Sequence, residues 1–380
     1  MSVSLMSDAS KTILLAGGGT GGHLYPGIAV AESLRKIAPD IRPIFLCTQR
    51  SIDRVILEPT GFEFIPQPIV PPARSISGLL RFWKSWRETK DLVRELLRDQ
   101  KPAAVLGLGG YAAGAAVRAA AARKIACALL NPDVIPGKAN QFLMSGVRAV
   151  CCQFDETKAH VSSAHQSKLR ITGCPIRSDL RNLPPRDQAV GRLNLDPALN
   201  TLVITGASLG AQTINEAAVA MFRGMTLPGW QVLHLAGGDH GDAVRAGYRD
   251  LAITARVIDF TAAMSDVWAV ADLAISRSGA SSCAELTACG VPSVLLPYPF
   301  HRDMHQRLNA KVLADAGAAV LLEDQKDPRK NADNLRPAVE TLITDVHRRA
   351  AMSEAARRIA RPDAADRVAA VITEFASSGR

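Results

Sequence analysis

Short apolar runs alternate with amphipathic segments from the beginning of the chain. The run 12–16 predicts a buried strand, a glycine-rich turn follows, and 26–37 predicts an amphipathic helix. Ile28, Ala31 and Leu34 share one face of that helix. The alternation continues with strands predicted at 44–47, 103–108, 127–130 and 149–152, and helices at 52–57, 87–98 and 112–123. Such alternation predicts parallel sheets with helices on both faces.

A second series begins after 176–200, a segment rich in Pro, Arg and Asp that we predict to be a linker. Its strands are predicted at 201–205, 232–236, 255–258, 273–276 and 293–296. Each half opens with a strand, a glycine-rich turn and a helix. The expected fold class is therefore α/β, with two Rossmann-like domains facing across a cleft. We place these domains at 1–178 and 179–352, and expect 353–380 to form a helical segment that packs back on the first domain.

The charge balance favours anionic partners. The 380-residue chain carries a formal charge of +9, which suits nucleic acid, phosphorylated ligands or an anionic membrane surface, or serves only solubility. Aromatic residues make up 5% of the chain and do not alternate with Lys and Arg. Single-stranded nucleic acid needs such stacking platforms, so no nucleic-acid partner is expected.

Seven cysteines occur without a CxxC pair, mostly in apolar stretches. Their odd number and their spacing predict buried, reduced thiols in a cytosolic protein, and no zinc site. We expect neither a secretion signal nor a membrane-spanning helix, because no apolar run reaches about 18 residues.

The turn at 17–22 has the pattern Gly-x-Gly-x-x-Gly, which lets the backbone approach an anionic ligand at a helix N-terminus. As a dinucleotide fingerprint it is incomplete, because 48–50 is Thr-Gln-Arg where an acidic residue would bind ribose. An NADP site that uses Arg50 stays open, whereas the lack of a Gly-Lys-Ser/Thr ending excludes a P-loop. His23 closes the turn, either as a general base or as a structural residue.

The second half offers two further anion-binding turns. In 206–211 Ser208 adds a hydroxyl donor, unless the turn only connects a strand to a helix. The turn 277–279 leads into a helix carrying Glu285, whose carboxylate can accept both hydroxyls of a ribose, or which is a plain surface residue. Gln306 is a candidate for binding a sugar hydroxyl.

Two basic features leave alternatives open. Arg177 is a candidate for neutralising phosphate charge, or an ordinary surface residue. Within 76–86, apolar residues that include Trp83 and Trp86 are mixed with basic ones. This pattern fits the surface of an anionic membrane, and it equally fits a helix that buries Leu and Trp in the core.

Five motifs together resemble the MurG family over about residues 12–355. They are Gly-Gly-Thr-Gly-Gly-His-x-x-Pro at 18–26, Gly-Gly-Tyr at 109–111, Gly-x-Ser-x-Gly-Ala at 206–211, Arg-Ser-Gly-Ala with Glu285, and His-Gln-x-x-Asn-Ala at 305–310. The resemblance implies a GT-B fold and an inverting transfer of N-acetylglucosamine from UDP-N-acetylglucosamine to lipid I, the undecaprenyl-diphosphate-linked acceptor, giving lipid II of peptidoglycan. It also implies no cofactor, no essential metal, and a peripheral position on the cytoplasmic face of the cell membrane, with 74–87 as the membrane contact.

The resemblance further implies the site residues. His23 is expected near the reacting hydroxyl. Residues expected on the acceptor diphosphate side are Gly18, Gly19, Gly109, Gly110 and Tyr111. Residues expected to contact substrate are Thr20, Gly21, Gly22, Asp133, Arg177, Ser208, Thr261, Ala280, Ser281, Ser282, Cys283, Ala284, Glu285 and Gln306. Among these, Arg177 and Ser208 are assigned to the donor phosphates, Thr261 to uracil, 280–285 to diphosphate and ribose, and Gln306 to the sugar.

One departure from the family pattern concerns the donor sugar. Family members usually carry His-Glu-Gln-Asn after the strand near residue 129, whereas this chain has Leu-Asn-Pro-Asp at 130–133. Asp133 can accept a bond from a sugar hydroxyl but cannot donate an amide N–H. Two alternatives stay open: another GT-B enzyme, such as a glycolipid synthase or a UDP-N-acetylglucosamine epimerase, and a non-catalytic nucleotide-sugar binder.

Overall fold

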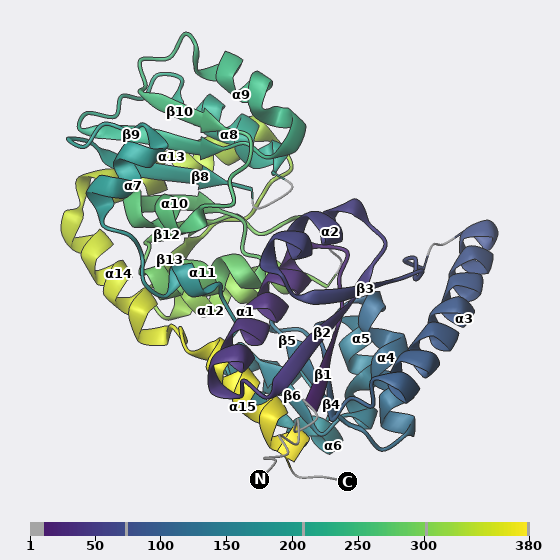
Figure 1. The fold of residues 1–380 in the computed structure, drawn as a ribbon. Helices are drawn as coiled ribbons and strands as arrows, with labels where there is room; N and C mark the ends of the chain where they lie inside the picture. The colour runs from purple at the N-terminus through teal and green to yellow at the C-terminus, as the bar shows by residue number, and fades with distance from the viewer. Residues whose placement is uncertain (1–10, 73–74, 207–209, 301–302, 378–380) are drawn as a thin grey trace. The chain divides into compact units, whose positions relative to one another are not determined.

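The computed structural model describes residues 11–72, 75–206, 210–300 and 303–377. The chain forms two compact units, named unit 1 (1–177 and 363–380) and unit 2 (178–362) (Figure 1). Unit 1 is discontinuous in sequence, because the end of the chain returns to it.

Unit 1 is built on a parallel sheet whose described strands run in the order β3-β2-β1-β4-β5-β6-β7. In the central strands nearly every residue is buried, as expected when helices cover both faces. Ala16 of β1 pairs with Gly107 of β4, so the turns after these strands begin side by side. The bounds are β1 (Lys11–Ala16), β2 (Ile41–Thr48), β3 (Glu63–Gln67), β4 (Ala104–Gly107), β5 (Ala126–Asn131), β6 (Ala149–Cys152) and β7 (Leu169–Ile171).

Helices pack on both faces of this sheet. They are α1 (Gly21–Ile37), α2 (Ser51–Leu57), α3 (Ile76–Asp99), α4 (Gly114–Ala122), α5 (Lys138–Leu143), α6 (Ser163–Gln166) and α15 (Ala364–Ser377), with short 3-10 helices η1 (Glu58–Thr60), η2 (Tyr111–Ala113), η3 (Met144–Gly146) and η4 (Asp155–His160). Side chains of α1 and α15 share one buried core with the sheet, and side chains of α3 and α4 share another.

Unit 2 repeats this design with the strand order β10-β9-β8-β11-β12-β13 among its described residues. Its strands are β8 (Asn200–Thr205), β9 (Trp230–Leu235), β10 (Ala255–Ile258), β11 (Ala271–Ser276), β12 (Ser293–Leu295) and β13 (Ala319–Leu321). Its helices are η5 (Ser178–Leu180), α7 (Arg186–Leu193), α8 (Gln212–Phe222), η6 (Gly238–His240), α9 (Gly241–Tyr248), α10 (Met264–Val270), α11 (Ala280–Cys289), α12 (His305–Asp315), α13 (Pro328–Thr344) and α14 (Val346–Ile359). Helices α8 and α13 pack together over the main buried core.

Both sheets have the strand order of doubly wound nucleotide-binding folds. The order reverses between β1 and β4 in unit 1, and between β8 and β11 in unit 2. Ligands of such sheets bind outside the carboxyl ends of the strands at this reversal. The four strand ends concerned lead into 17–20, 108–110, 206–211 and 277–279, so topology and glycine pattern select the same segments.

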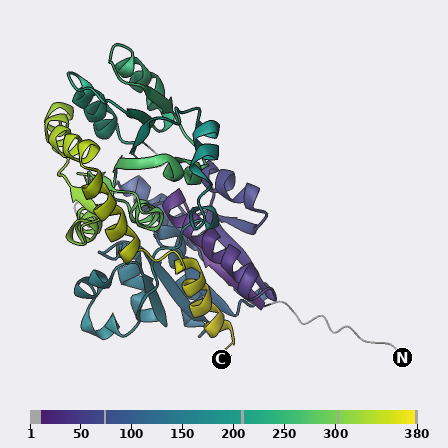
Figure 2. The ribbon, with the colours of Figure 1, turned by 90° about the vertical axis from the view of Figure 1, so that its left-hand side faces the viewer.

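The last two helices belong to different units. α14 packs on α11 in unit 2, where the Ser353 hydroxyl donates to the carbonyl of Gly290 at 2.6 Å. α15 packs on α1 in unit 1 (Figure 2). There the Ser33 hydroxyl donates to Asp366 Oδ1 at 2.7 Å. Residues 364–377 therefore supply part of the core of unit 1.

Several predicted elements differ from the structure. The first helix begins at Gly21 instead of Pro26, and Pro26 lies inside it at the loss of one backbone hydrogen bond. The segment before residue 87 is continuous with the helix after it, and α3 is capped by Ser75, whose side chain accepts from the Gly78 amide at 3.1 Å. The predicted linker contains α7. Strands β3, β7 and β13 lack a predicted counterpart, because they are short and partly exposed.

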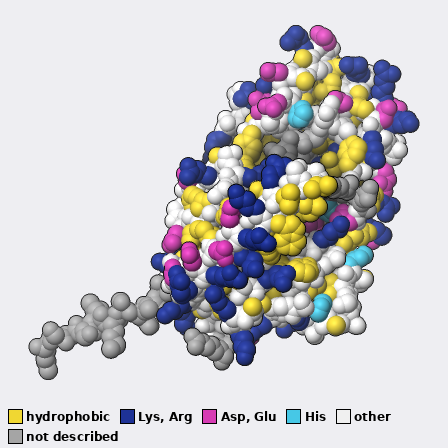
Figure 3. Space-filling model, turned by 90° about the vertical axis from the view of Figure 1, so that its right-hand side faces the viewer, with side chains coloured by type: hydrophobic (Ala, Val, Ile, Leu, Met, Phe, Trp, Pro, Cys, Tyr) yellow, Lys and Arg dark blue, Asp and Glu magenta, His cyan; other side chains and the backbone are white. Residues whose placement is uncertain are grey.

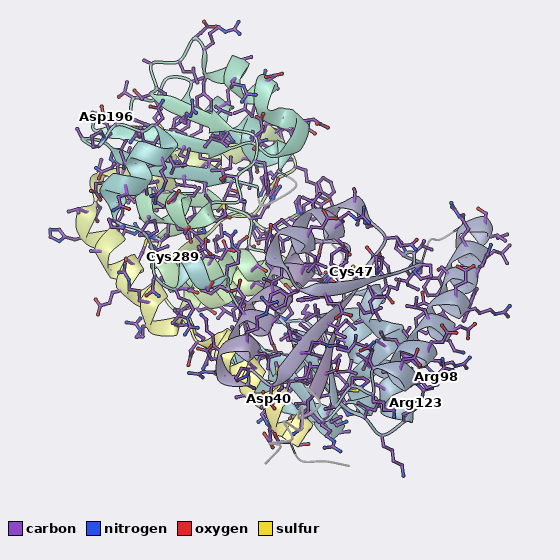
Figure 4. All side chains as sticks on the ribbon, viewed as in Figure 1. Asp40, Cys47, Arg98, Arg123, Asp196 and Cys289 are labelled. Carbon is purple, nitrogen blue, oxygen red and sulfur yellow. The ribbon has the colours of Figure 1, made fainter. Side chains whose placement is uncertain are left out.

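All seven cysteines are buried, as predicted. Figure 4 labels two of them, Cys47 in β2 and Cys289 at the end of α11. Burial raises the pKa of the Cys47, Cys127, Cys151 and Cys152 thiols to about 12. These four thiols are therefore protonated at neutral pH and act as small apolar core residues.

Candidate functional site

A buried carboxylate binds the backbone of the first glycine turn, which follows β1. Asp53, in the first turn of α2, has no exposed surface. Its oxygens accept from the Gly19 amide at 2.8 and 2.9 Å, and Oδ2 also accepts from the Thr48 amide and hydroxyl, both at 2.8 Å. A Cβ on Gly18 would lie 2.3 Å from Oδ2, so only glycine fits there. The Gly19 amide is thus bound within the protein.

Two more side chains flank this turn. Arg50 Nη1 donates to the Gly19 carbonyl at 2.7 Å, so the residue considered for an NADP phosphate is engaged within the turn. A Cβ on Gly19 would lie 3.3 Å from the Tyr111 hydroxyl. The structure therefore brings the motif 109–111 next to the first turn.

His23 lies in the first turn of α1 and packs on Gly109 and Gly110. Its Nδ1 donates to the Gly18 carbonyl at 3.3 Å and lies 3.1 Å from Thr20 Oγ1, which leaves Nε2 as the lone-pair nitrogen of the neutral ring. A Cβ on Gly110 would lie 2.9 Å from His23 Cε1, and one on Gly109 would lie 3.3 Å from Cδ2. Both glycines therefore make room for the imidazole.

The surroundings of His23 keep it neutral. Burial lowers its pKa below the ordinary value of 6.5, although the hydrogen bond to Gly18 and the carboxylates of Asp133 and Asp53 act in the opposite direction. Asp133 follows β5, and its backbone carbonyl accepts from Asn131 Nδ2 at 2.8 Å. At pH 7 the imidazole is thus in the form that a general base needs.

Arg177 is half-buried near the beginning of α1. Its guanidinium lies 5.4 Å from the centre of the Tyr25 ring, a cation–π distance. Tyr25 is two positions beyond His23 in the same helix. The contact holds Arg177 over the helix that follows the first turn.

In unit 2 the segment 206–211 connects β8 to α8. Ser208 lies outside the described residues. Gly210 has a φ of +71°, and a Cβ on Gly206 would lie 2.1 Å from the Ala211 nitrogen. Glycine is therefore required at both ends of this turn.

Helix α11 begins directly after the turn 277–279. The amides of Ser281 and Ser282 lie in its first turn, where no helical carbonyl can accept them, and both residues are partly exposed. Amides in this position suit a phosphate. Three other members of the predicted run have buried side chains: Ala280, Cys283 and Ala284.

Two further predicted residues have hydrogen-bond partners in α10 or in the loop before it. Glu285, partly exposed on α11, accepts through Oε2 from the indole N–H of Trp268 at 2.9 Å. Trp268 is buried in α10, 17 residues upstream, so the carboxylate has a fixed partner that no motif predicted. Thr261 lies in the loop before α10, where its Oγ1 accepts from the Ala263 amide at 3.0 Å.

Gln306, in α12, lies at the turn before α11. Its Oε1 accepts from the Tyr298 amide at 3.0 Å, and its backbone carbonyl accepts from the Ser278 hydroxyl at 2.8 Å. A Cβ on Gly279 would lie 4.0 Å from its Nε2. The structure therefore groups Gln306 with the turn 277–279, as the sequence interpretation expects of residues that share one ligand.

The N-terminal half of α3 exposes apolar side chains. Ile76 is 80% exposed, Leu80 67% and Trp83 57%, so these residues do not belong to the core. Figure 3 shows apolar side chains among Lys and Arg on this face of the molecule. The exposed basic residues of this part of α3 are Arg81, Lys84 and Arg87, while Arg74 lies outside the described residues. Within the described chain, no helix has the length and apolar character needed to cross a bilayer.

Comparison with known families matches both halves of the chain. Residues 13–152 match the glycosyltransferase family 28 N-terminal domain, and 201–368 match the glycosyltransferase family 28 C-terminal domain. Two similar proteins are named UDP-N-acetylglucosamine–N-acetylmuramyl-(pentapeptide) pyrophosphoryl-undecaprenol N-acetylglucosamine transferase. The one from Thermodesulfovibrio yellowstonii is 36% identical over 83% of this chain and 86% of its own. The one from Halothermothrix orenii is 32% identical over 92% and 95%.

Solved structures agree with this match. MurG from Acinetobacter baumannii has a TM-score of 0.74 and 25% identity, covering 96% of this chain and 99% of its own. UDP-GlcNAc 2-epimerase from Neisseria meningitidis has a TM-score of 0.67 at 16% identity, covering 96% and 100%, and shares the fold alone. The predicted GT-B fold is confirmed. The chain belongs to the MurG family, within glycosyltransferase family 28.

Proposed function

We propose that this protein transfers N-acetylglucosamine, with inversion, from UDP-N-acetylglucosamine to lipid I, forming lipid II of peptidoglycan. Similar proteins that align over most of the chain are named for this transfer. The observation that carries the proposal is His23, a neutral imidazole held by its Nδ1 at the switch point of unit 1. A nucleotide-sugar binder that performs no transfer has no use for a base held in this way.

The donor is assigned to unit 2. The amides of Ser281 and Ser282 would bind its diphosphate, and the Glu285 carboxylate would accept the ribose hydroxyls. The backbone at Thr261 would meet uracil, and Gln306 would bind the sugar. The support is that α11, which carries Ser281, Ser282 and Glu285, begins at the switch point, and that Gln306 contacts the turn before it. Glu285 and Gln306 are each held by a hydrogen bond of their own.

The acceptor is assigned to unit 1. Because the Gly19 amide is bound to Asp53, the acceptor diphosphate is assigned instead to the amides of Gly21 and Gly22 at the start of α1, where no helical carbonyl accepts them. Gly18 and Gly19 would let the diphosphate come close to the backbone and would not donate hydrogen bonds to it. The remaining members of the acceptor side are Thr20, Gly109, Gly110 and Tyr111.

In the reaction, the 4-hydroxyl of the acceptor sugar attacks the anomeric carbon of the donor as the bond to UDP breaks. His23 Nε2 takes the hydroxyl proton, since Nδ1 is held by the Gly18 carbonyl. The negative charge that develops on the leaving UDP would be stabilised by the amides at the start of α11, together with Ser208 and Arg177. Asp133 would accept from a hydroxyl of the donor sugar.

Membrane contact is proposed through 74–87. The exposed apolar residues Ile76, Leu80 and Trp83 suit the boundary of headgroups and acyl chains, and the basic residues beside them suit anionic lipid. A peripheral position on the cytoplasmic face of the membrane would give the enzyme access to its lipid-linked acceptor.

The decisive experiment follows labelled N-acetylglucosamine from its UDP donor to a lipid I analogue. His23→Ala is expected to lower kcat by about 10²–10⁴-fold, the usual contribution of a general base. Glu285→Ala is expected to weaken UDP binding by about tenfold, because the ribose hydroxyls lose a charged acceptor. Glu354→Ala, an exposed position on α14, is the matched control. Near wild-type turnover and UDP affinity in both site variants would refute the assignment.

The donor alone discriminates the remaining alternatives. An epimerase, which shares this fold, would convert or release the sugar without an acceptor. A non-catalytic binder would bind UDP and show no turnover with any acceptor. Transfer that strictly requires the lipid-linked acceptor supports the proposal.

A further inference from the structure

Arg277 begins the turn that leads into α11, where a cation would be expected to meet the donor phosphates. Instead the residue is only 5% exposed. Its Nη1 donates to the carbonyls of Leu296 at 2.9 Å and Pro297 at 3.1 Å, and to Asp324 Oδ2 at 2.7 Å. Its Nη2 donates to Thr213 Oγ1 at 2.6 Å. The guanidinium is therefore directed into unit 2.

The partner carboxylate is equally well bound. Asp324 follows β13, and its side chain has no exposed surface. Oδ2 accepts from Arg277 and from the Thr213 hydroxyl at 2.7 Å each, and Oδ1 accepts from Asn331 Nδ2 and the Lys326 amide at 2.8 Å each. Burial raises the pKa of Asp324, but these hydrogen bonds outweigh burial and hold the pKa below its ordinary value. The two side chains thus form a buried ion pair, in which both Nη atoms of Arg277 and both oxygens of Asp324 have hydrogen-bond partners.

Thr213 connects this pair to a second helix. It lies in the first turn of α8, so its hydroxyl joins the start of α8 to the residue that starts the turn before α11. The two strands that precede these helices are neighbours, with Thr205 of β8 opposite Ser276 of β11. Both helix starts therefore emerge on the same side of the switch point, and a single side-chain network spans them.

We infer that Arg277, Asp324 and Thr213 form a buried clamp that fixes the spacing of the first turns of α8 and α11, and thereby the affinity of unit 2 for the donor diphosphate. The inference rests on the proposed function and adds positioning residues to it, since none of the three is assigned a ligand contact. Donors that are already held in place need no reorganisation when the anion binds, so they bind it more tightly.

The test compares Thr213→Val with Thr213→Ser. Valine keeps the shape and removes the hydroxyl, whereas serine keeps the hydroxyl. Affinities for uridine and UDP are measured by calorimetry on the full chain. Thr213→Val is expected to weaken UDP about tenfold and uridine less than about twofold, because the diphosphate alone depends on the clamp. Thr213→Ser should recover most of the UDP affinity. Thr341→Val, whose hydroxyl bonds only within α13, is the matched control.

The ratio of UDP to uridine affinity decides the outcome, because a merely structural defect would weaken both ligands together. An unchanged ratio in Thr213→Val overturns the clamp, whether both affinities fall or neither does. Arg277→Lys, which keeps the charge and loses the forked donor, should lower the ratio as well. If the wild-type protein binds no UDP, the proposed function itself fails. If it binds UDP and the ratio does not move, only the clamp fails.

Discussion

In unit 1 the turn after β1 binds a carboxylate of the protein itself, that of Asp53. In unit 2 the turn after β11 begins with Arg277, which forms a buried ion pair with Asp324. Asp53 accepts hydrogen bonds from the Gly19 amide, so this donor of the turn is already used within the protein. Arg277 and Asp324 instead bind each other, Thr213 and the carbonyls that follow β12, and neither accepts from the amides of Ser281 and Ser282. The same pattern of strand, glycine turn and helix thus produces two electrostatically different sites. Under the proposed function, the first turn would chiefly position His23, and the turn before α11 would chiefly bind phosphate.

The largest effect is expected from removing the charge of Asp53, the carboxylate buried under the first turn. Asp53→Asn leaves buried donors at Gly19 and Thr48 without full partners, and each costs about 1–3 kcal/mol of unfolding free energy. We expect lower stability in denaturant titrations and a fall of at least about tenfold in transfer rate, because the Gly18 carbonyl that orients His23 shifts. UDP affinity should not change. Asp91→Asn, an exposed position on α3, is the control, and a matching loss of UDP affinity in Asp53→Asn would contradict the division of roles.

The donor site of unit 2 is tested by Trp268→Phe, which keeps an aromatic ring of smaller size and removes the N–H that holds Glu285. UDP binding should weaken about five- to tenfold, or about 1–1.4 kcal/mol, because Glu285 keeps its charge but loses the bond that orients it. The preference for UDP over 2′-deoxy-UDP should shrink as well, because the carboxylate is less well oriented toward the ribose. Trp230→Phe changes another buried tryptophan of unit 2, which packs under Arg349, and should leave both quantities unchanged. Equal effects of the two variants would show that Trp268 acts through packing alone.

The smallest predicted effect concerns pH. A base must be unprotonated, so transfer falls as the pH drops through the pKa of His23. Burial lowers that pKa, which places the acid limb of the kcat/KM profile below pH 6.5. Asp133 raises the pKa, so Asp133→Asn should move the limb to still lower pH, whereas Asp91→Asn should not move it. A shift to higher pH in Asp133→Asn would mean that another group sets the limb.

The sequence predicted the glycine turns and most strands, because buried parallel strands are short apolar runs that end where glycine begins. It did not predict the role of Asp53, because the dinucleotide fingerprint expects a ribose-binding acid at 48–50, whereas this acid lies three residues further and binds the turn itself. The partners of Glu285 and Arg277 lie 17 and 47 residues away, and such pairs leave no local pattern. The exposure of Trp83 was equally undecidable, because an amphipathic helix has the same composition whether its apolar face meets the core or the solvent.

The return of α15 to α1 has a consequence for the order in which the protein is made. A chain emerging from the ribosome folds from its N-terminus, domain by domain. Unit 2 is complete at residue 362, but the core of unit 1 also needs Val368, Ala369 and Ile372 from α15. Unit 1, which is synthesised first, therefore completes its core only after α15 has been synthesised. Until then, the apolar surface of α1 that α15 covers remains exposed to solvent.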